Sequence, residues 1–429
     1  MNKWIIIFML INVNLNAQTQ KITLEKAIQY SWENNLTIQD QNLQIEVSKI
    51  EIEKSKTNFL PSLGFTSSYN FQSGLIVDPT TNTRTTLNVQ SGNFGLSTNV
   101  DLFNWQNILR LKLTKLENEK LKYNTEITKE KLLIQIVQAF YQLQFSKEQE
   151  KLINFQIENT LQHLDRIGDE VRFGNKSESD LLEIRANLAT SKKQKVEVTS
   201  NYKQAYQTLQ NLLNKKDSTE YSLDEDLLWD KSNKQVGELY EESLLKRPEI
   251  QQSAIDIKIA SKNIDEQKSR YLPILSAGYS LSTFNTNRSL SSFGNQIADN
   301  RSHFFFFSLN IPIFNKLQTK QSINQSKIEL ERAELKTKQL EQEYYNILSD
   351  LHLKTNNTFD QWEASEESLK AYQKSFEKIE DKFQFGLITV YEYLNAKNNL
   401  LQEQTNSLIA KYTFYMNAVM LNWYEKSEI

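Results

Sequence analysis

The chain has 429 residues, of which 39% are hydrophobic and 24% charged, and its formal net charge at pH 7 is -3. This balance leaves no basic excess that could neutralise a phosphate backbone, so we expect no nucleic-acid partner. The absence of cysteine excludes a disulfide framework, cysteine-ligated zinc, a thiol nucleophile and an N-terminal lipid on cysteine. The chain has only 10 Gly and 5 Pro, too few to separate many short elements, so the sequence predicts long helices.

Residues 1–17 have the features of a secretory signal peptide. Lys3 supplies a positive charge, an apolar run extends from Trp4 to Ile11, and Ala17 is a small residue at the expected cleavage site. The alternative is a membrane-anchoring helix, but such a helix needs about 20 apolar residues and this run has about eight. We therefore expect the chain to be exported.

Landmarks in the first half of the chain return about 212 residues later. Aligning residues 36–63 with 248–275 without gaps gives 8 identities in 28 pairs, where average composition would give roughly two. We interpret the chain as a duplicated unit, with residues 18–220 as the first structural repeat and 221–429 as the second. The matching landmarks are Leu60-Pro61 with Leu272-Pro273 and Phe173-Gly174 with Phe385-Gly386.

Each repeat is predicted to contain a short helix, a strand hairpin, a very long helix and another short helix. The long helix of the first repeat, at 105–172, has apolar residues at coiled-coil spacing and would measure about 100 Å. It ends before Gly174, which can adopt the left-handed C-cap conformation. The other expected helices are 23–58, 177–213, 239–270, 316–384 and a last one that ends near 423.

Alternating apolar and polar residues predict two strand hairpins, at about 63–103 and 275–314. Each strand would have about 9–11 residues, which crosses a bilayer when tilted. We expect long polar loops at about 74–91 and 286–302. The expected lipid-facing positions are Phe65, Tyr69, Phe71, Phe94, Leu96, Tyr279, Phe305 and Phe307. Interfacial aromatic belts are expected to include Phe284 and all of Phe304 to Phe307 as well.

A hairpin that covers a soluble core would also alternate, so alternation alone leaves two interpretations. Four strands cannot close a cylinder or leave their edges exposed in lipid. If three chains contribute four strands each, a β-barrel of about twelve strands closes, and the helices continue it as an α-helical barrel. The expected fold is therefore mainly α with a small transmembrane β part. The alternative function is an exported structural coiled-coil rod without a pore.

Several short motifs carry a family resemblance. They are Leu60-Pro61, Leu272-Pro273, Arg247-Pro248-Glu249-Ile250, Gln384-Phe385-Gly386-Leu387 and Tyr393-Leu394-Asn395-Ala396. With these motifs and the doubled layout, the chain resembles the TolC-like outer-membrane efflux protein family. The resemblance implies a homotrimeric channel-tunnel in the outer membrane that extends into the periplasm. It also implies a passive exit duct that docks to a periplasmic adaptor (membrane fusion) protein and an inner-membrane transporter.

The resemblance also implies site residues. Adaptor docking carries over to the helical turns at Phe173, Gly174, Phe385, Gly386 and Leu387, although a helix C-cap requires glycine whether or not a partner docks. The acidic ring of the periplasmic constriction carries over to Glu392 and Asn395, of which only Glu392 is acidic. Three Glu392 carboxylates around an axis would repel one another, raise their pKa values and attract cations. The corresponding first-repeat residues, Asp180 and Glu183, are expected to be solvated surface charges.

Enzyme signatures are missing from the sequence. His163, His303 and His352 lie at scattered positions with no second ligand at metal-binding spacing. The sequence has no Gly-rich phosphate loop, nucleophile elbow or HExxH run. We expect neither catalysis nor a cofactor nor a metal site. The transported substrate stays open among drugs, metals, siderophores and proteins.

Overall fold

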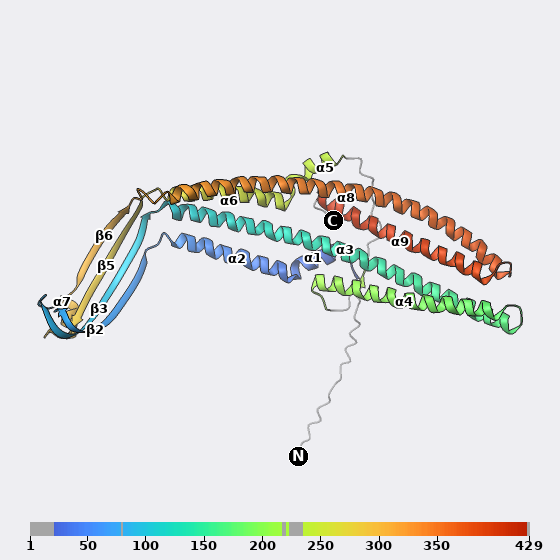
Figure 1. Cartoon of the computed structure of the whole chain (residues 1–429), viewed down its shortest axis with the longest axis horizontal. Helices are drawn as coiled ribbons and strands as arrows, with labels where there is room; N and C mark the ends of the chain where they lie inside the picture. Colours follow the sequence, from blue (N-terminus) through green and yellow to red (C-terminus); the bar gives the residue numbers. More distant parts are fainter. Residues whose placement is uncertain (1–20, 79, 217–219, 223–234, 427–429) are drawn as a thin grey trace, which may run out of the picture. The chain divides into compact units, whose positions relative to one another are not determined.

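The computed structural model describes residues 21–78, 80–216, 220–222 and 235–426, so the predicted signal peptide lies outside the described residues. Helices predominate, and the strands form a two-stranded and a four-stranded sheet (Figure 1). The helices are α1 (Leu24–Asn34), α2 (Leu36–Thr57), α3 (Trp105–Arg172), α4 (Glu178–Leu213), α5 (Val236–Ser243), α6 (Pro248–Ser269), α7 (Phe293–Asp299), α8 (Gln318–Gln384) and α9 (Val390–Lys426). The strands are β1 (Lys21–Ile22), β2 (Ser62–Val77), β3 (Arg84–Phe103), β4 (Glu220–Tyr221), β5 (Ile274–Thr286) and β6 (Ser302–Asn310).

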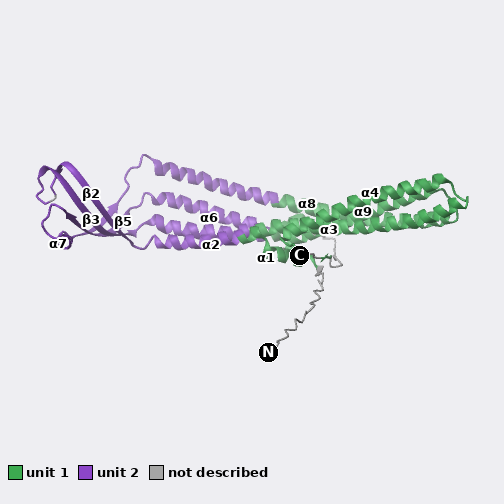
Figure 2. Ribbon diagram, turned by 90° about the horizontal axis from the view of Figure 1, so that it is seen from below, with its two compact units in different colours: residues 1–39, 128–243, 344–429 green, residues 40–127, 244–343 purple. Residues whose placement is uncertain are grey.

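The chain divides into two compact units (Figure 2). Unit 1 comprises residues 1–39, 128–243 and 344–429, and unit 2 comprises residues 40–127 and 244–343. The long helices α3 and α8 each contribute residues to both units. Each unit contains residues from both halves of the sequence, so the two compact units do not coincide with the two predicted sequence repeats.

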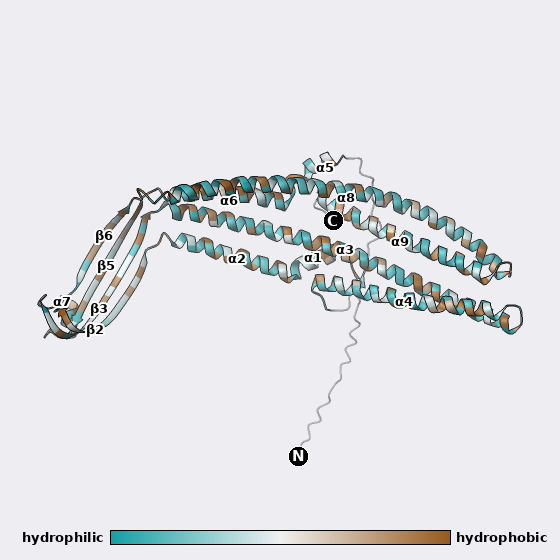
Figure 3. Ribbon diagram, in the orientation of Figure 1, coloured by the Kyte–Doolittle hydropathy of each residue, from teal (hydrophilic) through white to brown (hydrophobic). Residues whose placement is uncertain are grey.

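The two longest helices follow the sequence prediction closely. α3 has 68 residues with the predicted bounds, and α8 has 67 residues but begins at Gln318. It does not begin at Lys316 because Lys316 and Leu317 have positive φ angles of 56° and 63°, which an α-helix cannot contain. Hydrophilic and hydrophobic residues are interspersed along both helices (Figure 3). None of the described helices is both long and apolar enough to cross a membrane.

Two segments predicted as single helices are interrupted, so those predictions were wrong in detail. Asn35 lies in an extended conformation between α1 and α2, and its side chain accepts a 2.9 Å hydrogen bond from the backbone N–H of Thr37. This bond caps the start of α2. In the second repeat a 3₁₀ turn at Leu244–Lys246 separates α5 from α6. Because α6 begins at Pro248, helical geometry is disfavoured at the preceding Arg247, which is extended.

The largest hydrophobic core lies in unit 1 and joins α1, α3, α4, α8 and α9. Phe140 of α3 is fully buried at its centre. Burial of such a side chain contributes about 1.5–3 kcal/mol to folding. The Tyr344 hydroxyl donates to Ser243 Oγ at 2.5 Å, and the rings of Trp32 and Trp423 lie 6.4 Å apart. These contacts fix the middle parts of the helices within unit 1.

The four-stranded sheet of unit 2 is antiparallel throughout, in the order β2-β3-β5-β6. Its registers give it two contrasting faces. The apolar face carries Leu63, Phe65, Tyr69, Phe71, Phe94, Leu96, Val100, Leu275, Tyr279, Leu281, Phe305, Phe307 and Leu309. The polar face carries Gly64, Thr66, Ser68, Asn93, Gly95, Ser97, Asn99, Asp101, Ser276, Gly278, Ser280, Ser282, Phe304, Phe306 and Ser308.

The hairpin ends differ from the prediction. The expected long loop at 74–91 is mostly strand, because β2 continues to Val77 and β3 begins at Arg84. The expected loop at 286–302 contains α7, which packs on β5 through a 2.8 Å hydrogen bond from Thr283 Oγ1 to the Ile297 carbonyl. β6 ends at Asn310, so residues 311–314 lie outside the strand that was predicted to include them.

Candidate functional site: the helical turns and the sheet

Two tight turns join the helix pairs α3–α4 and α8–α9, at the same end of unit 1 (Figure 1). Gly174 and Gly386 have φ angles of +79° and +71°, a conformation that favours glycine. In each turn the residue after the glycine donates its N–H to a carbonyl five residues back. These bonds are Asn175 to Glu170 at 2.8 Å and Leu387 to Lys382 at 2.9 Å. Both turns therefore end their helices with the same glycine C-cap.

Each turn leads into a capped helix. Ser177 and Asp180 form a capping box at the start of α4, with Asp180 N–H donating to Ser177 Oγ at 3.1 Å. Thr389 and Glu392 make the same contacts at the start of α9. Neither box was predicted from the sequence, although a hydroxyl residue three positions before an acidic one is their usual signal. The two boxes are 212 residues apart, like the glycines.

The Glu392 carboxylate is engaged locally in the single chain. Its Oε2 accepts the Thr389 N–H at 2.8 Å and the Thr389 hydroxyl at 3.0 Å. These hydrogen bonds lower the pKa of Glu392. The expected rise in pKa depends on three copies around one axis and stays a prediction. Asn395 is also exposed, one helical turn further along α9.

Apolar side chains project from both turns. Phe173, Phe385 and Leu387 are 71%, 80% and 71% exposed. Large apolar side chains exposed together at a helix end are typical of a surface that another molecule covers. Of the turn residues named from the family resemblance, Phe173 in the first turn and Phe385 and Leu387 in the second are exposed, whereas Gly174 and Gly386 allow the backbone to turn.

A buried cluster lies directly behind the turns and joins both helix pairs. The rings of Phe383 and Tyr393 stack with centroids 4.2 Å apart. The Tyr393 hydroxyl lies 2.7 Å from His163 Nε2, and Lys397 Nζ donates to Thr160 Oγ1 at 2.9 Å. These contacts link α9, in the second sequence repeat, to α3, in the first. From the sequence, His163 was considered only as a metal ligand and rejected, and this cluster was not predicted.

Burial controls the protonation of this cluster. Lys397 is only 7% exposed, and desolvation lowers its pKa to about 8 although the nearby Glu380 carboxylate opposes the change. Desolvation, together with the charges of Lys397 and Arg166, lowers the pKa of His163 to about 4. His163 is therefore neutral at pH 7 and can accept a hydrogen bond from the Tyr393 hydroxyl.

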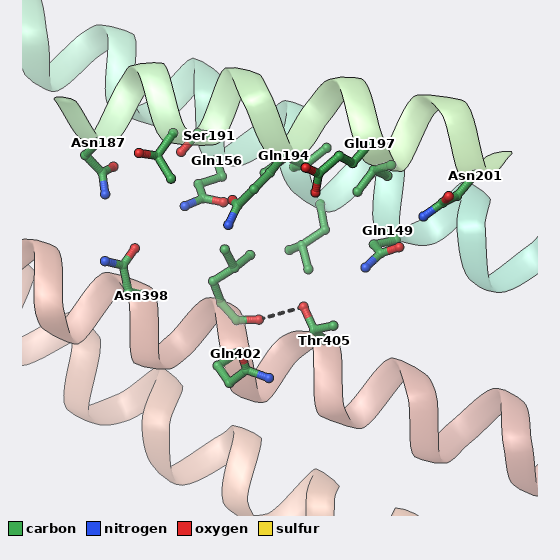
Figure 4. Close-up of a pocket in the computed structure, with 15 residues that line it drawn as sticks. Gln149, Gln156, Asn187, Ser191, Gln194, Glu197, Asn201, Asn398, Gln402 and Thr405 are labelled. Atoms are coloured by element: carbon green, nitrogen blue, oxygen red, sulfur yellow. Dashed lines mark hydrogen bonds between the residues drawn. The ribbon is translucent and has the colours of Figure 1, made fainter. Parts of the chain in front are cut away.

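A polar cavity of about 560 Å³ lies beyond this cluster, between α3, α4 and α9 (Figure 4). Asn187 and Gln194 of α4 face Asn398 and Gln402 of α9 across it. The Oε1 atom of Gln156 has no hydrogen-bond partner among the described residues. A roomy cavity lined by amides and hydroxyls is suited to water rather than to an apolar ligand.

The register of the sheet places the eight residues predicted to face lipid on one face. In register, Phe65 lies opposite Leu96, and Tyr279 lies opposite Phe305. Most of this apolar face is open, but the Phe94 ring contacts Phe293 of α7 with centroids 6.1 Å apart. Whether the face contacts lipid stays a prediction. Of the expected belt residues, Phe284, Phe304 and Phe306 lie on the other face, because a strand alternates its side chains.

A protein-family model named outer membrane efflux protein matches residues 27–215 and 239–422. The chain belongs to this family. Membership places the protein in the outer membrane, and the family is one of efflux channels. No group of His, Asp or Glu residues in the described ranges is arranged to hold a metal ion.

Members of the outer membrane efflux protein family resemble the chain to different extents in sequence and in structure. The toluene efflux pump outer membrane protein TtgC of Pseudomonas putida is 26% identical over 193 residues, which cover 43% of the chain and 38% of TtgC. The chain therefore matches well under half the length of this curated relative. A crystal structure of CusC has a TM-score of 0.80 at 17% identity and covers 96% of the chain and 94% of CusC. The Campylobacter jejuni outer membrane channel CmeC has a TM-score of 0.78 at 17% identity, with 95% and 87% covered. The fold is thus that of these channels.

Proposed function

We propose that three copies of the protein form an outer-membrane channel-tunnel, a passive exit duct rather than an enzyme. Each copy would consist of two structural repeats, residues 18–220 and residues 221–429. The observation that carries the proposal is a four-stranded sheet with one apolar face, one polar face and two open edges.

The open edges favour closure by further copies. β2 and β6 are the edge strands of the sheet, and each presents a row of unpaired backbone groups. In a bilayer such groups cost several kcal/mol each, so a four-stranded sheet needs partners there. Three copies would supply a closed sheet of about twelve strands, with the apolar face towards lipid and the polar face towards a lumen.

Helices of unit 2 offer independent support for contacts between copies. On α2, Leu43, Val47 and Ile50 are exposed and follow one another at spacings of four and three. On α8, Ile328 and Leu335 are exposed and seven residues apart. Apolar stripes with this period are typical of coiled-coil seams that a neighbouring helix covers. In the proposed trimer, the stripe on α2 of one copy would pack against the stripe on α8 of the next.

The turns supply the docking end of the proposed duct. Phe173, Phe385 and Leu387 would contact a periplasmic adaptor protein, which in turn would connect the duct to an inner-membrane transporter. Because the chain has no cysteine, single cysteines at 173 or 385 can carry a photo-crosslinker without background labelling. A cysteine at Glu178, beyond the turn, is a matched control. Adaptor adducts at 173 and 385 but not at 178 are expected, and equal yields at all three would contradict docking at the turns.

The channel itself is tested by mass and conductance. The mature protein extracted in detergent should have the mass of three chains and should form conducting pores in planar bilayers. Phe307→Arg should prevent membrane insertion, because a cation on the lipid face near the midplane costs about 2–4 kcal/mol. Ser308→Arg, on the polar face, should insert normally. A monomer that is soluble without detergent would instead support a coiled-coil rod and overturn the proposal.

A further inference from the structure

The four consecutive phenylalanines of β6 divide between the two faces of the sheet. Phe305 and Phe307 lie on the apolar face, whereas Phe304 and Phe306 lie on the polar face, opposite Ser280 and Gly278. The rings of Phe304 and Phe306 are stacked, with centroids 5.7 Å apart and planes inclined by 24°. A face lined mainly by hydroxyl and amide side chains therefore carries this stacked aromatic pair, with Phe284 of β5 as a further aromatic residue on the same face.

Phe304 is the open member of the aromatic pair, whereas Phe306 lies over Gly278 and is half-buried. Gly278 permits this position, because a Cβ atom built on it would overlap the Phe306 ring. The Phe304 side chain is 60% exposed, since the facing Ser280 is too small to cover it. Two neighbouring polar-face positions on β5, Ser276 and Ser282, are also small. A planar molecule can therefore approach the exposed Phe304 ring and extend over the neighbouring Phe306.

A carboxylate lies on the same face near the aromatic pair. Asp101 is the one charged residue on the polar face of the four described strands. Asp101 lies opposite Ser276, which is the next polar-face position on β5 after Gly278. Asp101 is therefore a diagonal neighbour of Gly278, at about 7–8 Å, and the Phe306 ring lies over Gly278. Ser276 Oγ donates to Asp101 Oδ1 at 2.8 Å and Asn104 Nδ2 donates to Oδ2 at 2.9 Å. A third donor is Asn107 Nδ2, at 3.4 Å.

These three donors are neutral, so they orient the Asp101 carboxylate without cancelling its charge. A fixed negative charge beside open aromatic faces matches a ligand that combines a positive charge with apolar or aromatic groups. Aromatic faces attract cations by about 0.5–2 kcal/mol according to their desolvation, which corresponds to about 2- to 30-fold in binding. Inorganic cations gain less from such a site, because they keep their hydration shell.

We propose that Phe304, Phe306 and Asp101 form a contact site for aromatic organic cations on the lumen face of the sheet. The inference rests on the proposed channel, because only closure of the sheet makes the polar face a lumen. It assigns a substrate class to the duct itself: lipophilic organic cations are retained briefly on the aromatic pair during passage.

The test is block of single-channel current in planar bilayers. Tetraphenylphosphonium, an aromatic cation, is compared with tetrabutylammonium, which has the same charge and no ring. The variant Phe304→Leu/Phe306→Leu removes the rings but keeps apolar side chains, and Phe305→Leu/Phe307→Leu is the matched control on the other face. Asp101→Asn removes the charge and keeps an acceptor for Ser276.

Tetraphenylphosphonium should block the wild-type channel for longer than tetrabutylammonium does. Its residence time should fall about fivefold in the Phe304→Leu/Phe306→Leu variant, fall in Asp101→Asn, and stay unchanged in the control. Equal residence times in the wild type and the Phe304→Leu/Phe306→Leu variant would overturn the contact site while leaving the channel intact. A wild-type protein that forms no pore would overturn the proposed function and the inference with it.

Discussion

The two helical turns of unit 1 have the same backbone conformation but differ in the buried side-chain contacts next to them. Gly174 and Gly386 have the same left-handed conformation, and both turns lead into a capping box. The buried contacts between the helix pairs come from the second repeat, through Tyr393 and Lys397. Their counterparts 212 residues earlier are Leu181 and Arg185, which make neither contact.

This difference separates what duplication preserves from what it does not. Local backbone geometry depends on a few residues within one turn, so both repeats retain it. Contacts between the two helix pairs depend on side chains from both repeats. Equivalent positions of the two repeats can therefore carry different residues, as Tyr393 and Leu181 do. We therefore expect substitutions of the two turn glycines to change the free energy of unfolding by similar amounts. Substitutions of Tyr393 and of its counterpart Leu181 should change it by different amounts.

The largest expected difference concerns Tyr393. Its ring is 1% exposed and stacks on Phe383, so Tyr393→Ala should lower the free energy of unfolding by about 3–5 kcal/mol. Leu181→Ala, the counterpart in the first repeat, removes a smaller and only half-buried side chain and should cost less. Urea unfolding of the full chain in detergent measures both. Equal losses would contradict the unequal roles of the repeats.

A pH dependence of stability should follow from His163. Burial and the charges of Lys397 and Arg166 lower its pKa to about 4, and Glu380 and Tyr393 also face it. The unfolded chain, with a pKa near 6.5, binds more protons between these values, so stability falls as pH falls from 6.5 towards 4. The expected loss is about 2 kcal/mol between pH 7.5 and 5.

The variant His163→Asn supplies the control for this prediction. It should lose the dependence between pH 5 and 7.5, because the carboxylates titrate mainly below this range and the buried Lys397, with a pKa of about 8, mainly above it. The same slope in the wild type and the variant would exclude His163 as the cause.

Replacing the glycine of either turn by alanine should lower the free energy of unfolding by the same amount. Gly174→Ala and Gly386→Ala each place a Cβ atom in the left-handed region, which costs about 1–2 kcal/mol. Nothing lies within 4 Å of a Cβ built at either position, so no clash adds to this cost. Unfolding free energies of the two variants should therefore agree. A clearly larger loss at one turn would show that the shared backbone is not the whole explanation.

The smallest effects on stability are expected at the exposed caps. Asp180→Ala and Glu392→Ala each remove half of a capping box, and the losses should be similar and smaller than at the glycines. Single-channel currents should separate the two residues, because only Glu392→Ala is expected to reduce cation selectivity. Unchanged selectivity would leave Glu392 with a capping role alone.

The sequence predicted the regular parts of the fold because their signals are local. The bounds of α3 follow from the continuous helical pattern between Trp105 and Gly174, and the strand faces follow from strict alternation. The break at Asn35 and helix α7 were not predicted. The break depends on the side chain of Asn35 alone, and α7 is a short segment that packs back on β5, the strand just before it.

The candidate site was predicted less completely than the fold. Gly174 and Gly386 were identified because a left-handed C-cap has a sequence signal. The His163–Tyr393 and Thr160–Lys397 pairs are more than 200 residues apart in the chain and have none. Alternation in the sequence assigned Phe305 and Phe307 to the apolar face, but the expected aromatic belt also included Phe304 and Phe306, which the register places on the polar face.

The central claim is that the apolar face of the sheet contacts lipid and the polar face lines a lumen. Single cysteines at Phe65 and Phe307, and at Ser97 and Ser280, can be labelled in the reconstituted protein from the lipid phase and from water. We expect lipid-phase labelling at 65 and 307 only, and labelling by a small water-soluble reagent at 97 and 280 only. Equal labelling of both faces by the water-soluble reagent would contradict the claim.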